Sequence, residues 1–288
     1  MALIGTHVGL SDTFFDTFRT YNDIPIQFML PSHSPTIEDI IQCRKYDKVN
    51  SAYIHTCLTS NLAGSVKGEA DSKYKTKLCH CRRELIKELD IGSCIGCGCV
   101  VHVGWQESTH KGMLTVIDTI TECLTKSGAT STRFKEYFDV IEGRKIILEN
   151  SAGEKNRLGS TLQELKFIYT SLPEYLKRKV KFCIDTAHLF GAGIYDFGKV
   201  THVQSFIQDF GNTFGLDKLE LFHLNDSAAD FGSSKDLHES LGRGFIYSKD
   251  GSMMALKELV NITASLKIPM ISETGTPIQD FTLLKSLK

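Results

Sequence analysis

The chain has 288 residues, of which 41% are apolar and 23% are charged. This composition is typical of a globular protein and excludes disorder along the whole chain. The formal net charge of −1 excludes a bulk polycation, so binding to nucleic acid would require a local basic patch or bound metal. The sequence contains no run of about 18 apolar residues, and residues 1–9 lack the features of a signal peptide. We therefore expect an intracellular protein of the cytoplasm or nucleus that is not secreted and does not enter a membrane.

Eight short runs rich in apolar and β-branched residues predict strands at 3–8, 25–30, 51–56, 98–103, 145–150, 180–186, 219–225 and 269–274. Most of these runs are continuously apolar, as strands covered on both faces are. Between them, apolar residues spaced three and four apart predict helices at 35–46, 74–89, 111–127, 161–172, 203–214 and 253–265. This alternation predicts a (β/α)₈ TIM barrel, folded as a single domain over residues 1–288. A doubly wound open sheet is less favoured, because the first strand is not followed by a glycine-rich phosphate turn.

Residue types that bind metals gather where the predicted strands end. Five histidines, two aspartates and two glutamates stand at or just after the ends of the third to eighth strands: His55, His102, Glu149, Asp185, His188, His223, Asp236, His238 and Glu273. In a parallel barrel all strands point the same way, so these side chains would meet at the face where such barrels carry their active sites. Without cations, so many carboxylates and imidazoles would leave buried charge poorly compensated.

The predicted ligands are nitrogen and oxygen atoms without thiolate, a set that suits zinc, manganese or iron. Nine ligands are too many for one tetrahedral ion and suit two or three ions that share a bridging carboxylate. Sites with several ions about 3.5–4 Å apart are typical of enzymes that displace phosphodiesters. The sequence therefore predicts a hydrolytic metal centre.

The motifs around these residues resemble those of the endonuclease IV family of abasic-site DNA repair enzymes. The matching stretches, in chain order, are Leu148-Glu149-Asn150-Ser151-Ala152-Gly153, Cys183-Ile184-Asp185-Thr186-Ala187-His188, Phe222-His223-Leu224-Asn225-Asp226-Ser227, Lys235-Asp236-Leu237-His238-Glu239-Ser240-Leu241-Gly242 and Ile271-Ser272-Glu273-Thr274. Ile4-Gly5-Thr6-His7-Val8 and His55 followed by Asn61-Leu62 are also similar. The resemblance covers most of the chain and is strongest between residues 145 and 274.

The resemblance implies a (β/α)₈ barrel that holds three Zn²⁺ ions, with Mn²⁺ or Fe possible at some positions. It implies that His55, His102 and Glu149 bind the first ion, and that Glu149, as the bridge, binds the second with Asp185, His223 and Glu273. His188, Asp236 and His238 would bind the third ion, and His7 would support the ligands without being one. The family hydrolyses the phosphodiester on the 5′ side of abasic sites, using a metal-bridging hydroxide, and trims blocked 3′ ends.

The implied catalytic residues are Glu149 and Glu273, the implied partner is double-stranded DNA that contains abasic sites, and no organic cofactor is needed. We expect a monomer. The DNA-reading loop departs from the family pattern, because Leu58 and Thr59 replace its tyrosine and leucine. Arg243 and Trp105 are further candidates for DNA contact. A divergent, compact version of this kind would suit a large DNA virus or a parasite.

Two other functions remain open at this stage. A metal-dependent sugar isomerase or epimerase would use Glu149, Asp185, His223 and Glu273 with one ion, and it would leave the third predicted ion unexplained. A protein that binds abasic sites or DNA ends without cutting would have at least one broken ligand position. The nine cysteines are expected to be free thiols in a reducing compartment, with a metal site or disulfide among Cys79, Cys81, Cys94, Cys97 and Cys99 as the alternatives.

Overall fold

The computed structural model describes residues 3–9, 17, 20–21, 23–30, 35–44, 51–57, 60–64 and 71–287, with the side chains of 71–74 excepted. Its main strands are β1 (Ile4–His7), β2 (Ile26–Phe28), β3 (Ala52–His55), β4 (Gly98–His102), β5 (Ile146–Glu149), β6 (Val180–Asp185), β7 (Leu219–His223) and β10 (Met270–Ser272). Each lies inside one of the eight predicted strands, so that prediction is confirmed. A short antiparallel pair, β8 (Asp226–Ser227) and β9 (His238–Glu239), was not predicted.

The helices are α2 (Ile37–Arg44), α3 (Asp71–Ile95), α4 (Thr109–Thr125), α5 (Ala129–Phe134), α6 (Leu162–Ser171), α7 (Glu174–Lys177), α8 (Thr186–Gly191), α9 (Val200–Phe214), α10 (Ser252–Leu266) and α11 (Pro277–Ser286), with 3₁₀ turns η2 (Glu154–Asn156) and η3 (Leu216–Lys218). The six predicted helices correspond to α2, α3, α4, α6, α9 and α10. Helices α5, α7, α8 and α11 were missed. In the described part of the chain, no helix combines the length and the apolarity that a membrane crossing requires.

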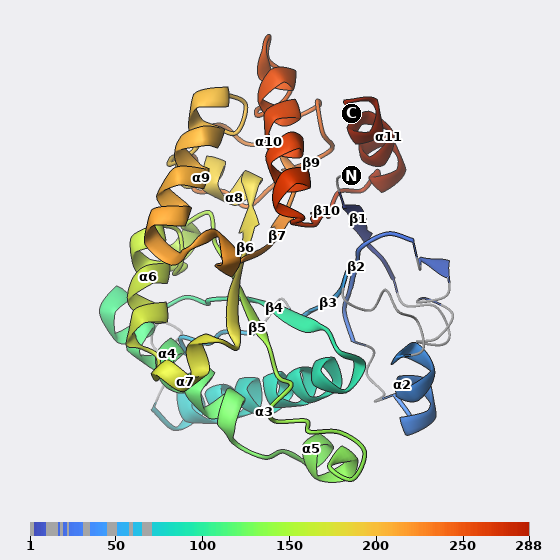
Figure 1. Ribbon diagram of the computed structural model, residues 1–288. Helices are drawn as coiled ribbons and strands as arrows, with labels where there is room; N and C mark the ends of the chain where they lie inside the picture. Colours follow the sequence, from blue (N-terminus) through green and yellow to red (C-terminus); the bar gives the residue numbers. More distant parts are fainter. Residues whose placement is uncertain are drawn as a thin grey trace. The chain divides into compact units, whose positions relative to one another are not determined.

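The eight main strands close into a parallel barrel in chain order, in which β10 is the neighbour of β1 (Figure 1). The predicted (β/α)₈ fold is therefore confirmed. The chain divides into two compact units: unit 1 comprises residues 1–7, 149–166 and 182–288, and unit 2 comprises residues 8–148 and 167–181. A single domain over 1–288 stays a prediction, and each unit is described by itself below.

Unit 1 contains the parallel ladder β6–β7–β10–β1, covered by helices that include α9 and α10 side by side (Figure 1). Helix α9 turns a row of phenylalanines toward the sheet, because Val203, Phe206 and Phe210 recur at helical spacing and all are buried. Phe206 meets Phe222 of β7 with ring centroids 5.9 Å apart in an edge-to-face arrangement, the geometry that aromatic pairs prefer.

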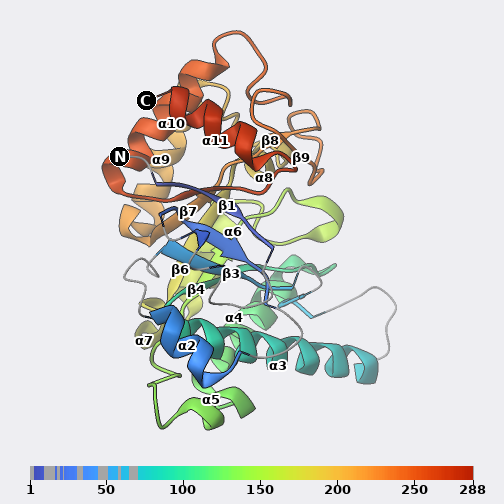
Figure 2. The ribbon, with the colours of Figure 1, turned by 90° about the vertical axis from the view of Figure 1, so that its right-hand side faces the viewer.

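Unit 2 contains the ladder β2–β3–β4, and its long helix α3 packs against α4 and α5 (Figure 2). A fully buried ion pair fixes this packing. Arg144 Nε donates to Asp90 Oδ1 on α3 at 2.8 Å, and its Nη1 donates to the carbonyl oxygens of Cys123 and Lys126 at 2.7 Å. Asp90 also accepts the amide of Ser131 on α5. A buried charge is tolerated only when it is paired and hydrogen-bonded, and this cluster meets both conditions.

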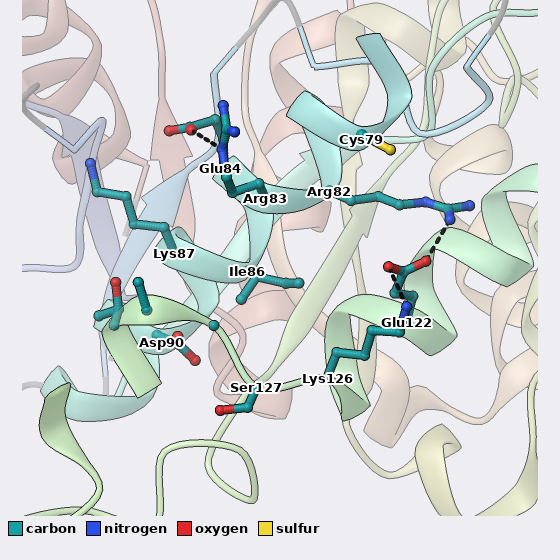
Figure 3. A pocket seen from close by; sticks show the side chains of 13 residues that line it. Cys79, Arg82, Arg83, Glu84, Ile86, Lys87, Asp90, Glu122, Lys126 and Ser127 are labelled. Atoms are coloured by element: carbon teal, nitrogen blue, oxygen red, sulfur yellow. Dashed lines mark hydrogen bonds and ion pairs between the residues drawn. The ribbon is translucent and has the colours of Figure 1, made fainter. Parts of the chain in front are cut away.

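A surface pocket of about 400 Å³ lies between α3, α4 and α5 beside this cluster (Figure 3). Five of its charged side chains pair within it. Arg82 and Lys126 both contact the Glu122 carboxylate, and Arg83 contacts Glu84 (Figure 3). The charges of this pocket are therefore largely balanced within it.

Candidate metal centre

The carboxyl ends of four strands bring four of the predicted ligands together in unit 1. They are Glu149 at the end of β5, Asp185 at the end of β6, His223 at the end of β7 and Glu273 just after β10, and one donor atom from each lies within 4.8 Å of the others. His223 Nδ1 lies 3.0 Å from Glu149 Oε1 and 3.1 Å from Glu273 Oε2. Parallel strands produce this convergence because their carboxyl ends share one rim.

A second group adjoins the first and shares Asp185. Asp185, His188 and His238 also offer donor atoms within 4.8 Å of one another. Asp236 belongs to the same group, since its Oδ1 lies 3.1 Å from His188 Nε2 and 3.4 Å from His238 Nε2. Seven of the nine predicted ligands thus gather in unit 1, including all three that the resemblance assigns to the third ion.

Helix α8 explains why Asp185 and His188 face the same point. Asp185 is the N-cap of α8, and its Oδ1 accepts the backbone N–H of His188 at 2.9 Å. An N-cap carboxylate stabilises a helix start in this way. The cap leaves Asp185 Oδ2 directed at His238 Nε2, 3.4 Å away. The helix of six residues is therefore part of the site, although its sequence gave no helical signal.

Two asparagines that were not predicted as functional hold the carboxylates in place. Asn150 Oδ1 accepts the Asp185 amide at 2.7 Å and its Nδ2 donates to the Asp185 carbonyl oxygen at 3.2 Å. Asn225 Nδ2 donates to Asp185 Oδ2 at 2.7 Å, and its Oδ1 accepts the Glu273 amide at 3.0 Å. Both asparagines are fully buried. The sequence offered one signal for each asparagine. Asn150 directly follows the predicted ligand Glu149, and Asn225 lies in the same matching stretch as the predicted ligand His223.

The centre is strongly acidic and desolvated. Burial by itself lowers the pKa of His188, but the carboxylates of Asp185, Asp236 and Glu149 outweigh it and raise that pKa well above 6.5. For His223, burial lowers the pKa, whereas Cys183, Glu273 and Glu149 raise it well above 6.5. The carboxylates thus favour positive charge at this point of the protein. Divalent cations would balance the same charge, so this donor set of imidazole nitrogens and carboxylate oxygens fits zinc or a similar ion.

The remaining two predicted ligands lie in unit 2. His55 ends β3 and His102 ends β4, and their rings meet edge to face with centroids 5.3 Å apart. The Nδ1 atom of His55 lies 2.8 Å from the carbonyl oxygen of Thr56. A histidine that ligates metal commonly has its other nitrogen anchored in this way.

The loop after β8, residues 228–247 with the short strand β9, carries Asp236 and His238. A buried aspartate, Asp226, fixes the C-terminal part of this loop. The Asp226 carboxylate is fully buried and accepts backbone N–H groups at 2.8–3.4 Å from five residues: Ser227, Gly242, Gly244, Ile246 and Tyr247. Burial raises the pKa of Asp226, while these N–H groups lower it. The carboxylate therefore depends on the amides to stay charged, and the amides depend on it for a partner. The sequence motif that contains Asp226 carries no signal for this role.

The near end of the same loop rests on α8. The backbone N–H groups of Gly232 and Ser234 donate to the carbonyl oxygens of Phe190 and Gly191. Gly191 has no side chain, and a Cβ at this position would lie 2.8 Å from the Lys235 carbonyl oxygen and 3.1 Å from Ala152 Cβ. The close approach of Lys235, which directly precedes Asp236, therefore requires glycine at position 191.

The other predicted site residues are placed as follows. His7 Nδ1 lies 3.8 Å from Glu273 Oε1, beside the first group and not within it. Arg243 is exposed in the loop that Asp226 holds, and Trp105 is half-buried three residues after His102. Leu58 and Thr59 lie outside the described residues. All nine cysteines are free thiols, as expected, and Cys94, Cys97 and Cys99 are buried core residues.

Comparisons with known proteins place the chain in a family. A family model described as a xylose isomerase-like TIM barrel matches residues 51–262. The chain belongs to this family. A probable endonuclease 4 of Natronomonas pharaonis is 36% identical over 141 residues, which cover 49% of this chain and 47% of that protein. A putative endonuclease 4 of Acanthamoeba polyphaga mimivirus is 27% identical over 94% of this chain and 85% of its own.

The crystal structure of endonuclease IV from Thermus thermophilus superimposes with a TM-score of 0.74 at 18% identity, covering 99% of this chain and 98% of that one. This similarity supports the barrel fold of the xylose isomerase-like family. The chain spans less than half the length of the first curated relatives it matches, with 47%, 43% and 35% of their lengths aligned.

Proposed function

We propose that this member of the family is a metal-dependent DNA repair endonuclease that hydrolyses the phosphodiester 5′ of abasic sites and trims blocked 3′ ends. The observation that carries the proposal is the adjoining pair of acidic, histidine-containing groups in unit 1, joined through Asp185. The names of the relatives, endonuclease 4 and apurinic-apyrimidinic endonuclease, agree with it. A sugar isomerase with one ion would have no need for the second group formed by His188, Asp236 and His238.

Three zinc ions form the proposed centre. Glu149, Asp185, His223 and Glu273 would hold one ion, and His188, Asp236 and His238 would hold another. His55 and His102 would complete a third set with Glu149, since all strand ends of a closed parallel barrel meet at one rim. When bound, such ions make water a nucleophile at neutral pH and stabilise charge on the phosphate and on the leaving oxygen.

The protein's own contribution is to fix the donors before substrate arrives. Asn150 and Asn225 fix Asp185 by hydrogen bonds to its backbone and to its carboxylate. Since Asp185 is held at both its backbone and its carboxylate, this donor needs little reorganisation when the phosphate binds, and such preorganisation is a main source of electrostatic catalysis. Glu149 and Glu273 flank His223 on both sides, where they would hold an ion and orient the attacking group in line with the scissile bond.

The DNA-binding surface is proposed around this centre. Arg243 is exposed in the loop fixed by Asp226, so its guanidinium would contact the phosphate backbone and contribute to affinity without touching the reaction. Trp105, Leu58 and Thr59 would contact the DNA near the lesion. We further propose that the protein acts as a monomer, inside the cell.

The decisive experiment is incision of a synthetic duplex that contains one abasic site, with and without chelator. We expect 5′ incision that is lost after chelation and restored by zinc. Glu149→Gln should abolish incision with the fold retained, whereas Glu136→Gln, at an exposed position, should leave it unchanged. Metal analysis should give about three ions per chain. Activity that survives exhaustive chelation, or full activity of Glu149→Gln, would refute the proposal, and a single ion with isomerase activity would support the sugar enzyme.

A further inference from the structure

Unit 2 contains a second cavity that the proposed metal chemistry does not use. It has a volume of about 510 Å³ and is lined by the segment after β3, the first half of α3 and the residue Trp105 beyond β4. Its lining residues are mostly apolar in surface, with Lys77 and His80 of α3 at its edge. This volume lies within the range of small-molecule sites.

Trp105 is held in this cavity by a specific backbone clamp. The side chain of Asn61 accepts the Trp105 N–H at Oδ1, at 2.9 Å, and donates from Nδ2 to the Trp105 carbonyl oxygen at 3.1 Å. Asn61 Oδ1 also accepts the Ala63 N–H at 3.1 Å. The side-chain amide of Asn61 thus pairs with both backbone groups of Trp105, as a neighbouring β-strand would. It thereby fixes the backbone position from which the indole side chain extends.

Gly104 makes this clamp possible. Its φ of +104° is a conformation that residues with a side chain rarely adopt, and a Cβ there would lie 2.2 Å from Asn61 Oδ1. The clamping segment is itself anchored, because Leu62 and Ala63 are fully buried and Thr119 of α4 donates to the Leu62 carbonyl oxygen at 3.2 Å. The wall that carries Trp105 is therefore preorganised and not free to collapse into the cavity.

We propose that this cavity is a subsite for an unstacked nucleobase of the DNA substrate, with the indole of Trp105 as its stacking platform. The proposal rests on the proposed function, because it takes the substrate to be DNA. Cys57 of the cavity follows the predicted ligand His55 by two residues, and Trp105 follows His102 by three. A nucleotide whose phosphate reaches these histidines would have its base within reach of the cavity.

The residues that line the cavity suit any of the four nucleobases equally. Aromatic stacking uses the π-face that all bases share and needs no sequence-specific hydrogen bonds. Lys77 is exposed at the edge of the cavity, where its ammonium group would meet the phosphate of the same nucleotide. The subsite would therefore bind an extrahelical base regardless of its sequence and hold the strand in register during incision.

Trp105 is the only tryptophan of the chain, so intrinsic fluorescence reports on this position alone. The test is a titration of the Glu149→Gln protein, which should not cut, with oligothymidylate and with an abasic backbone of tetrahydrofuran units that has the same number of phosphates. We expect oligothymidylate to quench the fluorescence and the abasic backbone to leave it unchanged. Equal responses to the two probes, or no response to either, would overturn the proposal.

Variants measured by anisotropy of labelled oligonucleotides make the test independent of fluorescence. Trp105→Ala should weaken binding of oligothymidylate by at least about fivefold, the lower end of the stacking contribution per base, and leave the abasic backbone unaffected, whereas Trp105→Phe should keep most of the affinity. Asn61→Ala should reproduce the Trp105→Ala loss, because it releases the clamp. Unchanged affinity for oligothymidylate in Trp105→Ala would refute the subsite.

The two proposals fail separately. Base-dependent quenching in a protein that never incises an abasic duplex would keep the subsite and discard the nuclease. Metal-dependent incision without base-dependent quenching would keep the nuclease and discard the subsite.

Discussion

Replacing Asp226 with asparagine should detach the loop that follows β8, residues 228–247 with the short strand β9, from the barrel. In the native protein Oδ1 accepts the amides of Ser227 and Ile246, and Oδ2 accepts those of Gly242 and Gly244. An asparagine puts an NH₂ group in place of one of these oxygens. Whichever way it turns, two buried backbone N–H groups lose their acceptor and face another donor.

The expected cost follows from that count. A buried donor left without a partner costs about 1–3 kcal/mol, so two such donors cost roughly 2–6 kcal/mol. This is a large part of the ~5–15 kcal/mol that stabilises a typical domain. Since the loop also presents Asp236 and His238, we expect the variant to bind about one zinc fewer per chain.

Urea unfolding of the metal-free proteins measures the first effect, and metal analysis of the folded, zinc-loaded proteins measures the second. Asp230→Asn is the matched control, because Asp230 lies exposed in the same loop and its substitution should change stability by no more than about 0.5 kcal/mol. A loss below ~1 kcal/mol in Asp226→Asn, with a full zinc count, would show that the amide cage does not hold this loop.

Three further predictions test separate parts of the structure. Gly191→Ala places a Cβ 2.8 Å from the Lys235 carbonyl oxygen, so metal analysis should show loss of the ion assigned to the Asp236 group while the others remain. Burial raises the pKa of Glu88 to about 7, so the native state holds this proton when the unfolded chain has released it. Stability should fall as pH rises from about 4.5 to 7, and Glu88→Gln should remove that slope and add roughly 3 kcal/mol above pH 7 in urea unfolding. Arg243→Ala should weaken DNA binding and reduce the slope of log affinity against log salt by about 0.9, the value of one phosphate contact, with turnover little changed.

Each of these has a control in the chain. A Cβ at Gly9 meets nothing within 4 Å, so Gly9→Ala should keep the full zinc count, and a loss there equal to that of Gly191→Ala would mean that the effect is not local. Glu136→Gln, at an exposed position and not among the groups that shift the pKa of Glu88, should keep the pH slope; a slope that persists in Glu88→Gln would place its origin elsewhere. Lys257→Ala, at an exposed position of α10, should keep the salt slope, and an unchanged slope in Arg243→Ala would put this arginine outside the interface.

The sequence predicted the eight main strands because most of them are short, continuously apolar runs, as strands buried on both faces are, and because they alternate with helical segments. It predicted six helices because their apolar residues recur three and four positions apart, which places them on one helical face. Helix α8 was missed because its six residues are too short to show a period, and what starts it is the capping carboxylate of Asp185. The sequence also predicted that the metal-binding residue types share one rim, because parallel strands in a barrel end on the same side.

Only the tertiary structure showed what holds those residues in place. Asn150 reaches Asp185 across 35 positions of the chain, and Asn225 reaches Glu273 across 48. The Arg144–Asp90 pair and the clamp of Asn61 on Trp105 also join distant segments. Local pattern determines the type of an element because one repeating face must be buried, and that information lies within a few residues. A polar side chain that fixes a distant backbone leaves no periodic signal, so its partner is decided by how the elements pack.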